Sequence, residues 1–225
     1  GGLLYFLAND GVNGEELWRS DGTKAGTWML EIRPGPDHPY ASEFTDLDGL
    51  LVFRARDGAH GYEVWTSDGT VAGTGMVQDI HPGSSGSDAT GFTVVGDVVF
   101  FAANDGAHGY ELWKTDGAAA GTVLVRDVHV GSKSSYPRDF TDVGGTLFFS
   151  AETDGAGREL WTSDGAAAGT AMVADMAPGD AGWYPTWLGV AGGRLYLSHA
   201  DAAHGEELWV SDGTAAGTHI VKDIN

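Results

Sequence analysis

Residues 16–23 read Glu16-Leu17-Trp18-Arg19-Ser20-Asp21-Gly22-Thr23, and close variants of these eight residues recur four more times along the 225-residue chain. The tryptophans of the five copies are spaced by 47, 48, 48 and 48 residues, at Trp18, Trp65, Trp113, Trp161 and Trp209. A fixed period of this length indicates a repeat architecture in which each copy is one supersecondary unit. We therefore expect a single domain over residues 1–225, built from five copies of one unit.

Each copy holds four short apolar runs separated by turn residues. In the fourth copy these runs are 140–143, 147–151, 159–161 and 171–175, lengths that are typical of strands. The first two are joined by Gly144-Gly145, a two-residue loop of the kind that makes tight hairpins. Leucine and tryptophan alternate on the third run, so both faces of the sheet must be covered. The sequence predicts an all-β, five-bladed β-propeller with four-stranded antiparallel blades and a repeat of about 48 residues. The alternative, an open stack of small sheets, is disfavoured because neither end copy has the polar face of a capping repeat.

The first copy lacks the segment that precedes the second strand elsewhere, for example residues 82–95. The chain then begins at a second strand and ends at a fourth, and we expect one blade to lack its inner strand. A longer parent chain could supply that strand, or another device could protect the free edge. We favour the longer parent, because residues 221–225 stop where other copies continue with Pro-Gly.

Charge and composition exclude several classes of function. Asp and Glu number 32 against 12 Lys and Arg, for a net charge of -20, and this excess repels phosphate backbones and anionic lipids. Nucleic acids and acidic membranes are therefore not expected as partners. The absence of cysteine excludes disulfides, thiolate metal sites and thiol catalysis. No apolar run approaches the roughly 18 residues of a membrane-spanning helix, so no membrane insertion is expected.

The repeated octapeptide resembles the bacterial repeat family named after its signature Glu-Leu-Trp-x-x-Asp-Gly-Thr, and the resemblance covers essentially the whole chain. Three positions depart from the signature, with Val64 in place of Leu and Ala118 and Ala166 in place of the final Thr. The resemblance implies propeller-like blades of large exported proteins. It therefore implies an extracellular or cell-surface location, and it implies no particular chemistry.

One face of the predicted propeller carries the loops that differ between copies. The loops joining strands two and three share this face with the segments linking one blade to the next, whereas the hairpins and Asp-Gly-Thr loops of the opposite face follow turn chemistry. The variable loops carry aromatic and imidazole rings at Tyr40, Tyr136, Trp183, Tyr184, His60, His108 and His204. Rings of this kind stack on sugars or peptide side chains while nearby polar groups fix the orientation. We therefore predict a face for a glycan or protein ligand; the alternative is that the rings only pack the loops onto the blade edges.

The same loops carry one acid per copy, a candidate set for calcium: Asp10, Asp57, Asp105, Asp154 and Asp201. Ca²⁺ takes six to eight hard oxygen ligands, and each loop offers too few, so no cofactor is required. The alternative is that Asp-Gly marks a tight turn and that the glutamate opening the third strand is merely exposed. A second repeated acid ends the outer strand, and we expect it to cap a turn or protect the edge; it is Glu31, Asp79, Asp127, Asp175 and Asp223.

Catalysis needs unique, mutually close groups, whereas this chain distributes its polar residues by repetition. A glycan-active enzyme would place carboxylates on the inner strands, where the sequence offers Asp46 and Asp142 with Glu43 and Asp139 nearby. No acid and base pair with distinct environments can be named. The sequence therefore favours a non-catalytic, lectin-like binding module, with a structural spacer in a large surface protein as the alternative.

Overall fold

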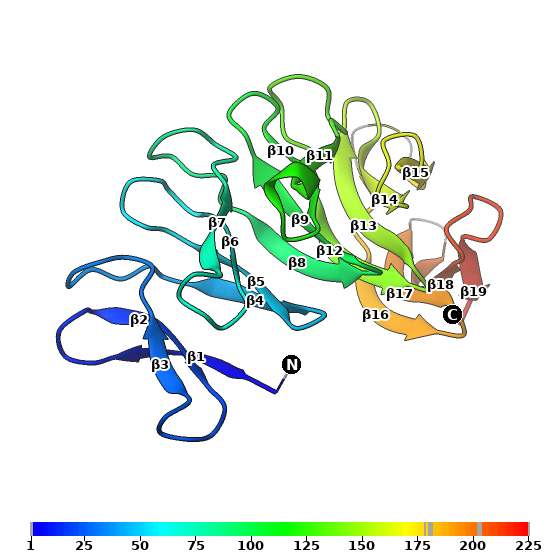
Figure 1. Ribbon diagram of the computed structural model, residues 1–225. Helices are drawn as coiled ribbons and strands as arrows, with labels where there is room; N and C mark the ends of the chain where they lie inside the picture. The colour runs from blue at the N-terminus through cyan, green and yellow to red at the C-terminus, as the bar shows by residue number, and fades with distance from the viewer. Residues whose placement is uncertain (1, 178, 180–181, 202–203, 225) are drawn as a thin grey trace.

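The computed structural model describes residues 2–177, 179, 182–201 and 204–224, and within them it consists of five antiparallel sheets that follow one another along an arc (Figure 1). Each sheet is a meander in which strands pair in chain order. We number the sheets blade 1 to blade 5. No helix in the described part of the chain is long and apolar enough to cross a bilayer.

The blade bounds match the predicted repeat. Blade 1 contains β1 (Leu4–Asn9), β2 (Glu15–Ser20) and β3 (Thr27–Leu30). Blade 2 contains β4 (Ser42–Leu47), β5 (Leu50–Ala55), β6 (Glu63–Ser67) and β7 (Thr74–Gln78). Blade 3 contains β8 (Thr90–Val95), β9 (Val98–Asn104), β10 (Tyr110–Thr115) and β11 (Val123–Arg126), with a short 3-10 turn, η1 (Ala119–Gly121), before β11. Blade 4 contains β12 (Arg138–Val143), β13 (Thr146–Thr153), β14 (Gly157–Ser163) and β15 (Ala171–Ala174), and blade 5 contains β16 (Thr186–Ala191), β17 (Arg194–Asp201), β18 (Gly205–Ser211) and β19 (His219–Lys222).

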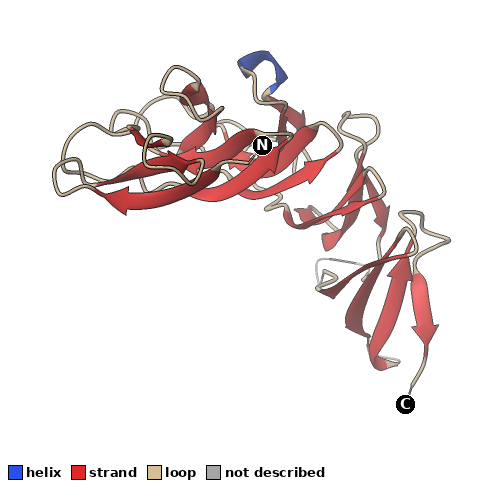
Figure 2. Cartoon of the chain, turned by 60° about the horizontal axis from the view of Figure 1, so that its bottom comes forward, coloured by secondary structure: helices blue, strands red, loops and turns tan. Residues whose placement is uncertain are grey.

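Within the described residues blade 1 has three strands, and the strand it lacks is the inner one, as predicted. Phe6 of β1 pairs with Trp18, just as Phe53 of β5 pairs with Trp65, so β1 is a second strand. The inner strands of blades 2 to 4 lie side by side, because β8 contacts both β4 and β12. Figure 2 shows successive sheets fanned next to one another. Among the described residues, no strand of blade 1 pairs with a strand of blade 5.

Every junction between blades repeats one packing pattern, in which a tryptophan of the later blade packs on apolar side chains of the earlier one. Trp113 of blade 3 packs in one buried cluster with Val52 and Val64 of blade 2, and the other three junctions follow the same rule. Trp18 belongs to the first blade, which has no preceding blade among the described residues, and it is only half-buried. The predicted position of the tryptophans between blades is therefore confirmed for the four junctions present.

A bulge near the start of each inner strand sets how that strand enters its blade. The register shifts between Thr90 and Thr93 in β8 and between Arg138 and Thr141 in β12. The residue after the first paired position takes a positive φ of +75° at Gly91 and +62° at Asp139. Bulges re-aim the side chains around them, and here they present Thr90 and Arg138 at the mouth of the junction between blades 3 and 4.

Candidate ligand-binding face

A buried glutamate at the start of each third strand anchors the segment that links one blade to the next. The prediction that this glutamate is exposed is wrong: it is at most 2 % exposed in every blade, at Glu16, Glu63, Glu111, Glu159 and Glu207. Glu111 accepts hydrogen bonds from the backbone nitrogens of Val128 and Ser135, both at 2.8 Å, and from the Ser135 hydroxyl at 2.7 Å. Burial raises the pKa of Glu111, although these hydrogen bonds oppose the shift. The linking segments are therefore held rigidly against their blades.

The acids proposed as calcium ligands are already engaged by their own loops. Asp57 Oδ1 accepts the backbone nitrogens of Ala59 and His60, and Asp57 Oδ2 lies 2.8 Å from Nδ1 of the His60 ring. Asp105 holds His108 in the same way, with 2.7 Å between Oδ2 and Nδ1. The hydrogen bond to Asp57 raises the pKa of His60.

The other members of the calcium set vary. Asp10 accepts hydrogen bonds from the backbone and the amide of Asn13, and Asp154 pairs with Lys133 at 2.7 Å. The side chain of Asp201 lies outside the described part of the chain, and His204, three residues further along, is half-buried. Within the described residues, no group of three or more His, Asp or Glu side chains is arranged to hold a metal ion.

Of the aromatic side chains predicted to form the face, three are half-exposed and one is not. Tyr40, Tyr136 and Tyr184 are 50 %, 54 % and 56 % exposed, whereas Trp183 is fully buried. Trp183 packs edge-on against Trp209, with ring centroids 6.0 Å apart, so the expectation that it offers a ring to a ligand is wrong. It stands in the chain position that Ser135 holds in the preceding linking segment, and that alignment was the missed signal.

A pocket of about 430 Å³ opens at the junction between blades 3 and 4, and Tyr136 forms part of its wall. Its lining comes from both blades: Thr90, Ala102, Tyr110, Tyr136, Pro137, Arg138, Glu152 and Arg158. The rings of Tyr110 and Tyr136 stack at 5.8 Å with 22° between their planes, and the Tyr110 hydroxyl donates to Asp88 at 3.3 Å. Of these residues, the sequence had singled out Tyr136 alone as a ligand-binding candidate.

An ion pair between the buried Arg158 and the partly exposed Glu152 stiffens one wall of this pocket. Arg158 Nη2 donates to Glu152 Oε1 at 2.9 Å, and Nη1 donates to the Tyr136 carbonyl and to Ser150 Oγ, both at 3.0 Å. The Glu152 backbone nitrogen in turn donates to the Ser135 carbonyl. Burial, reinforced by the nearby charge of Arg138, lowers the pKa of Arg158. The guanidinium thus fixes the backbone on which the Tyr136 ring is mounted.

The inner-strand acids considered for catalysis serve the turns and bulges. Asp46 and Asp142 each accept a hydrogen bond from a hairpin glycine at 2.7 Å. Glu43 accepts the Gly91 nitrogen at 3.0 Å, and Asp139 accepts the Ser150 hydroxyl at 2.7 Å. Each of these four carboxylates therefore has a structural role in a turn or at a bulge.

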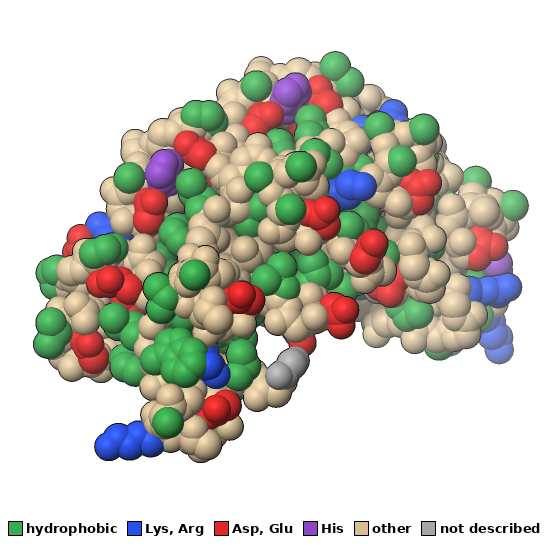
Figure 3. All heavy atoms as spheres, in the orientation of Figure 1, with side chains coloured by type: hydrophobic (Ala, Val, Ile, Leu, Met, Phe, Trp, Pro, Cys, Tyr) green, Lys and Arg blue, Asp and Glu red, His purple; other side chains and the backbone are tan. Residues whose placement is uncertain are grey.

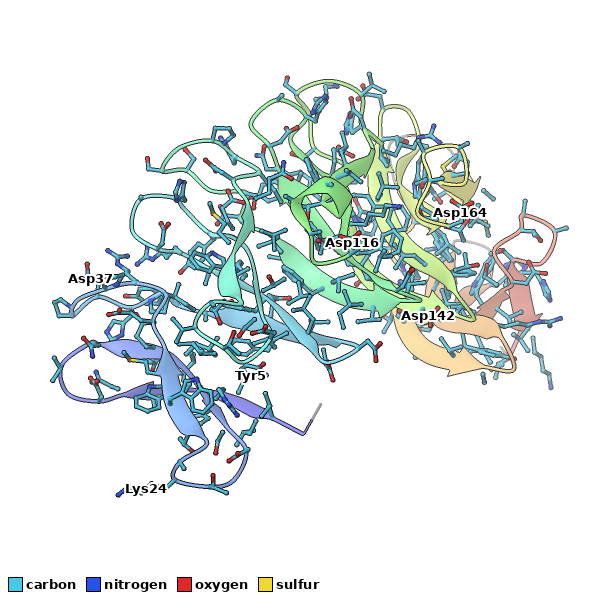
Figure 4. The ribbon with its side chains drawn as sticks, in the orientation of Figure 1. Tyr5, Lys24, Asp37, Asp116, Asp142 and Asp164 are labelled. Atoms are coloured by element: carbon cyan, nitrogen blue, oxygen red, sulfur yellow. The ribbon has the colours of Figure 1, made fainter. Side chains whose placement is uncertain are left out.

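The opposite face is dominated by acids in turns. Figure 4 marks Asp116 and Asp164 in loops, Asp142 near the end of strand β12, and Lys24 and Asp37 at opposite ends of blade 1. A wider hollow of about 630 Å³ lies between the hairpins of blades 2 and 3, lined by Asp48, Asp97, Asp116 and mainly aliphatic residues. It has no aromatic ring and no cationic group in its lining. Carboxylates are also scattered over the whole surface visible in Figure 3 rather than gathered at one site.

Solved structures share this fold. One is a puromycin hydrolase mutant complexed with PGG, with 16% identity and a TM-score of 0.57, covering 94% of this chain and 34% of that chain. Oligopeptidase B from Leishmania major matches with 13% identity and a TM-score of 0.58, over 100% of this chain and 33% of that one. The β-propeller domain of the Trilobed protease from Pyrococcus furiosus, described as having an open velcro topology, matches with 13% identity, a TM-score of 0.53 and coverage of 100% and 82%.

The chain spans about a third of the length of the first two proteins. No family model matches the chain, and no curated protein sequence matches it. Sequence identities this low support a shared fold, but they do not indicate a shared activity. Together with the sheet topology, the comparisons show a five-bladed β-propeller.

Proposed function

We propose that this propeller is a non-catalytic binding module of the cell surface or extracellular medium, which takes a glycan or protein ligand on the face carrying the variable loops. The observation that carries the proposal is the pocket between blades 3 and 4, with two stacked tyrosines beside a buried arginine that pairs with a glutamate. A concave site with aromatic walls and a few fixed polar groups is the usual form of a ligand site.

Rigidity supports the proposal. Glu111 fixes the linking segment that carries Tyr136, and Arg158 bonds directly to the Tyr136 carbonyl. A ligand meeting such a wall orders few protein groups on binding, so less of its interaction energy is lost to entropy. The half-exposed Tyr136 ring is therefore available at little conformational cost.

Location and alternatives rest on the repeat itself. The resemblance to the Glu-Leu-Trp-x-x-Asp-Gly-Thr family supports export, and the net charge of -20 disfavours nucleic acids and acidic membranes. A spacer role is the second candidate, favoured by the glutamate anchors, which bind the backbone of the segments that link the blades. A glycan-active enzyme is the least supported, since Asp46 and Asp142 are committed to turns.

The test is a screen of the purified chain on a glycan array and on a panel of extracellular proteins, with calcium and again with chelator. We expect binding that survives chelation and is lost in Tyr136→Ala. Tyr184→Ala is the matched control, because Tyr184 is equally exposed at the equivalent position of blade 5, outside the pocket. Equal loss in both variants would remove the pocket from the proposal. Loss only with chelator would shift attention to the acidic loops, and no binding under any condition would favour the spacer.

A further inference from the structure

The junction between blades 2 and 3 contains an arginine where the next junction has its pocket. Arg54 of β5 pairs with Ser42 of β4, and in the same register Ala102 of β9 pairs with Thr90 of β8. The Arg54 guanidinium lies over the Tyr62 ring, with 4.8 Å from its carbon to the ring centroid. Its Nε donates to Ser42 Oγ at 3.2 Å, and its Nη1 reaches the Ala89 carbonyl at 3.5 Å.

The walls around this arginine recur at the next junction without the arginine itself. Thr90 replaces Ser42 with another hydroxyl, Tyr110 replaces Tyr62 with the same ring, and Pro137 replaces Ala89. All three line the pocket, together with the small side chain of Ala102. The pocket is therefore the space that an arginine side chain fills one blade earlier.

The charged side chains that line the pocket are paired with one another or with a neighbour, and one carboxylate oxygen is left over. Two lining cations already have partners: Arg158 pairs with Glu152 at 2.9 Å, and Arg138 lies 3.6 Å from Asp139. Glu152 Oε2 has no hydrogen-bond partner among the described residues, so it remains free to accept from a ligand. The lining itself holds the Arg138 and Arg158 guanidinium groups and the Glu152 carboxylate. The carboxylates of Asp139 and Asp88 lie beside it, and Arg54 is close enough to act on Tyr110.

We propose that the pocket binds a guanidinium group, presented as an arginine side chain of a partner protein. The planar cation would stack on Tyr110, as Arg54 does on Tyr62, and donate to Glu152 Oε2 and Thr90 Oγ1. Cation–π contact and charge-assisted hydrogen bonds would supply the affinity. This inference rests on the proposed binding function and selects a protein over a glycan as the ligand.

The first experiment measures binding of N-acetyl-arginine amide by NMR titration, with the glutamine and glutamate amides as comparison probes. We expect saturable shifts with the arginine probe and at least tenfold weaker binding of the other two. In Ala102→Arg the protein's own side chain would fill the pocket and weaken binding at least tenfold. Ala102→Ser is the matched control, because serine holds the equivalent positions Ser150 and Ser198, and it should bind like the wild type.

A second variant makes the reverse change. Arg54→Ala should open a second site over Tyr62 and raise the stoichiometry of the arginine probe from one to two. Circular dichroism and thermal unfolding of each variant would show that the blades remain folded. Preferred binding of the glutamate probe, equal binding to Ala102→Arg, or no saturable shift with any probe would each overturn the inference.

The screens separate this inference from the proposed function. An uncharged glycan whose binding is lost in Ala102→Arg, but is not displaced by the arginine probe, would overturn the inference and keep the binding module. Binding of the arginine probe together with a silent array and protein panel would support the guanidinium site and count against the module.

Discussion

Replacing Glu159 by glutamine should make the stability of the protein less dependent on pH. Glu159 is fully buried and accepts the backbone nitrogens of Met176 and Ala177. Burial raises the pKa of its carboxyl from 4.5 to about 7, against the effect of these two hydrogen bonds. The serine that supports the glutamate in blades 2 and 3 is replaced here by Trp183, so no hydroxyl bonds to this carboxylate among the described residues.

The sign follows from proton linkage. The folded protein holds the Glu159 proton more tightly than the unfolded chain, so the group stabilises the fold fully below about pH 4.5 and loses that contribution as pH rises through about 7. Between pH 5 and pH 8 the shift corresponds to roughly 2 to 3 kcal/mol of unfolding free energy. Glutamine does not titrate, so this pH-dependent part should vanish in Glu159→Gln.

The assay is urea unfolding of the wild type and Glu159→Gln at pH 5 and pH 8, followed by tryptophan fluorescence. The wild type should lose roughly 2 to 3 kcal/mol relative to the variant on going to pH 8. Glu111→Gln is the control: the pKa of Glu111 is also raised, but four hydrogen bonds oppose the shift, so its effect should depend less on pH. A stability difference between wild type and Glu159→Gln that stays the same at both pH values would refute the reasoning.

The packing of the blades leads to two further predictions. Trp113→Ala should lower the unfolding free energy by about 3 to 5 kcal/mol, as expected for truncating a buried aromatic residue. Trp18 is only half-buried, because it lies in the first blade of the arc, so Trp18→Ala should cost about half as much. Equal losses of stability in thermal melts of the two variants would contradict the blade order. Gly86→Ala should destabilise strongly, because φ is +78° and a Cβ would lie 2.3 Å from the Tyr62 nitrogen. Gly75→Ala, with open space around it, should leave the melting temperature within a few degrees of the wild type.

The fold could be read from the sequence because it depends on features that every copy repeats. The period, the strand lengths and the alternation of leucine with tryptophan fixed five meanders with two covered faces. The missing inner strand of blade 1 also followed from counting residues within the copies. Each of these features is a local pattern in the sequence, so it can be recognised without knowing how the blades pack.

The glutamate anchors were misjudged although their position carried a signal. Glu111 and Trp113 lie two residues apart on β10, so both point to the same face. That face is buried in a blade junction, and an acid there must be satisfied internally. An acid at the start of a strand is usually exposed, and this expectation outweighed the pattern.

The pocket could not be predicted from the sequence, because it exists where the small side chain of Ala102 leaves space between two blades. Aligning the copies shows Ala102 where blade 2 has Arg54. Whether the gap stays open depends on how Tyr110 and Pro137 are held, and only the packed junction shows this. The sequence therefore pointed to Tyr136, which lines the pocket, but not to the pocket itself.

The buried arginine of blade 4 is hard to explain by stability. Arg158 takes the place that Tyr62 and Tyr110 hold in the two preceding blades, and a tyrosine at this position carries no charge of its own. Burying a guanidinium costs desolvation energy that a paired carboxylate only roughly offsets, so a well-packed neutral residue is commonly at least as stable. Glu152 has also replaced the Asn104 of blade 3, so both partners depart from the preceding blade at this one junction. Residues that recur in every blade stabilise features that all blades share. The Arg158–Glu152 pair occurs at one junction, so we expect it to serve a feature of that junction. A pocket wall that holds the Tyr136 backbone and offers a free carboxylate oxygen is such a feature.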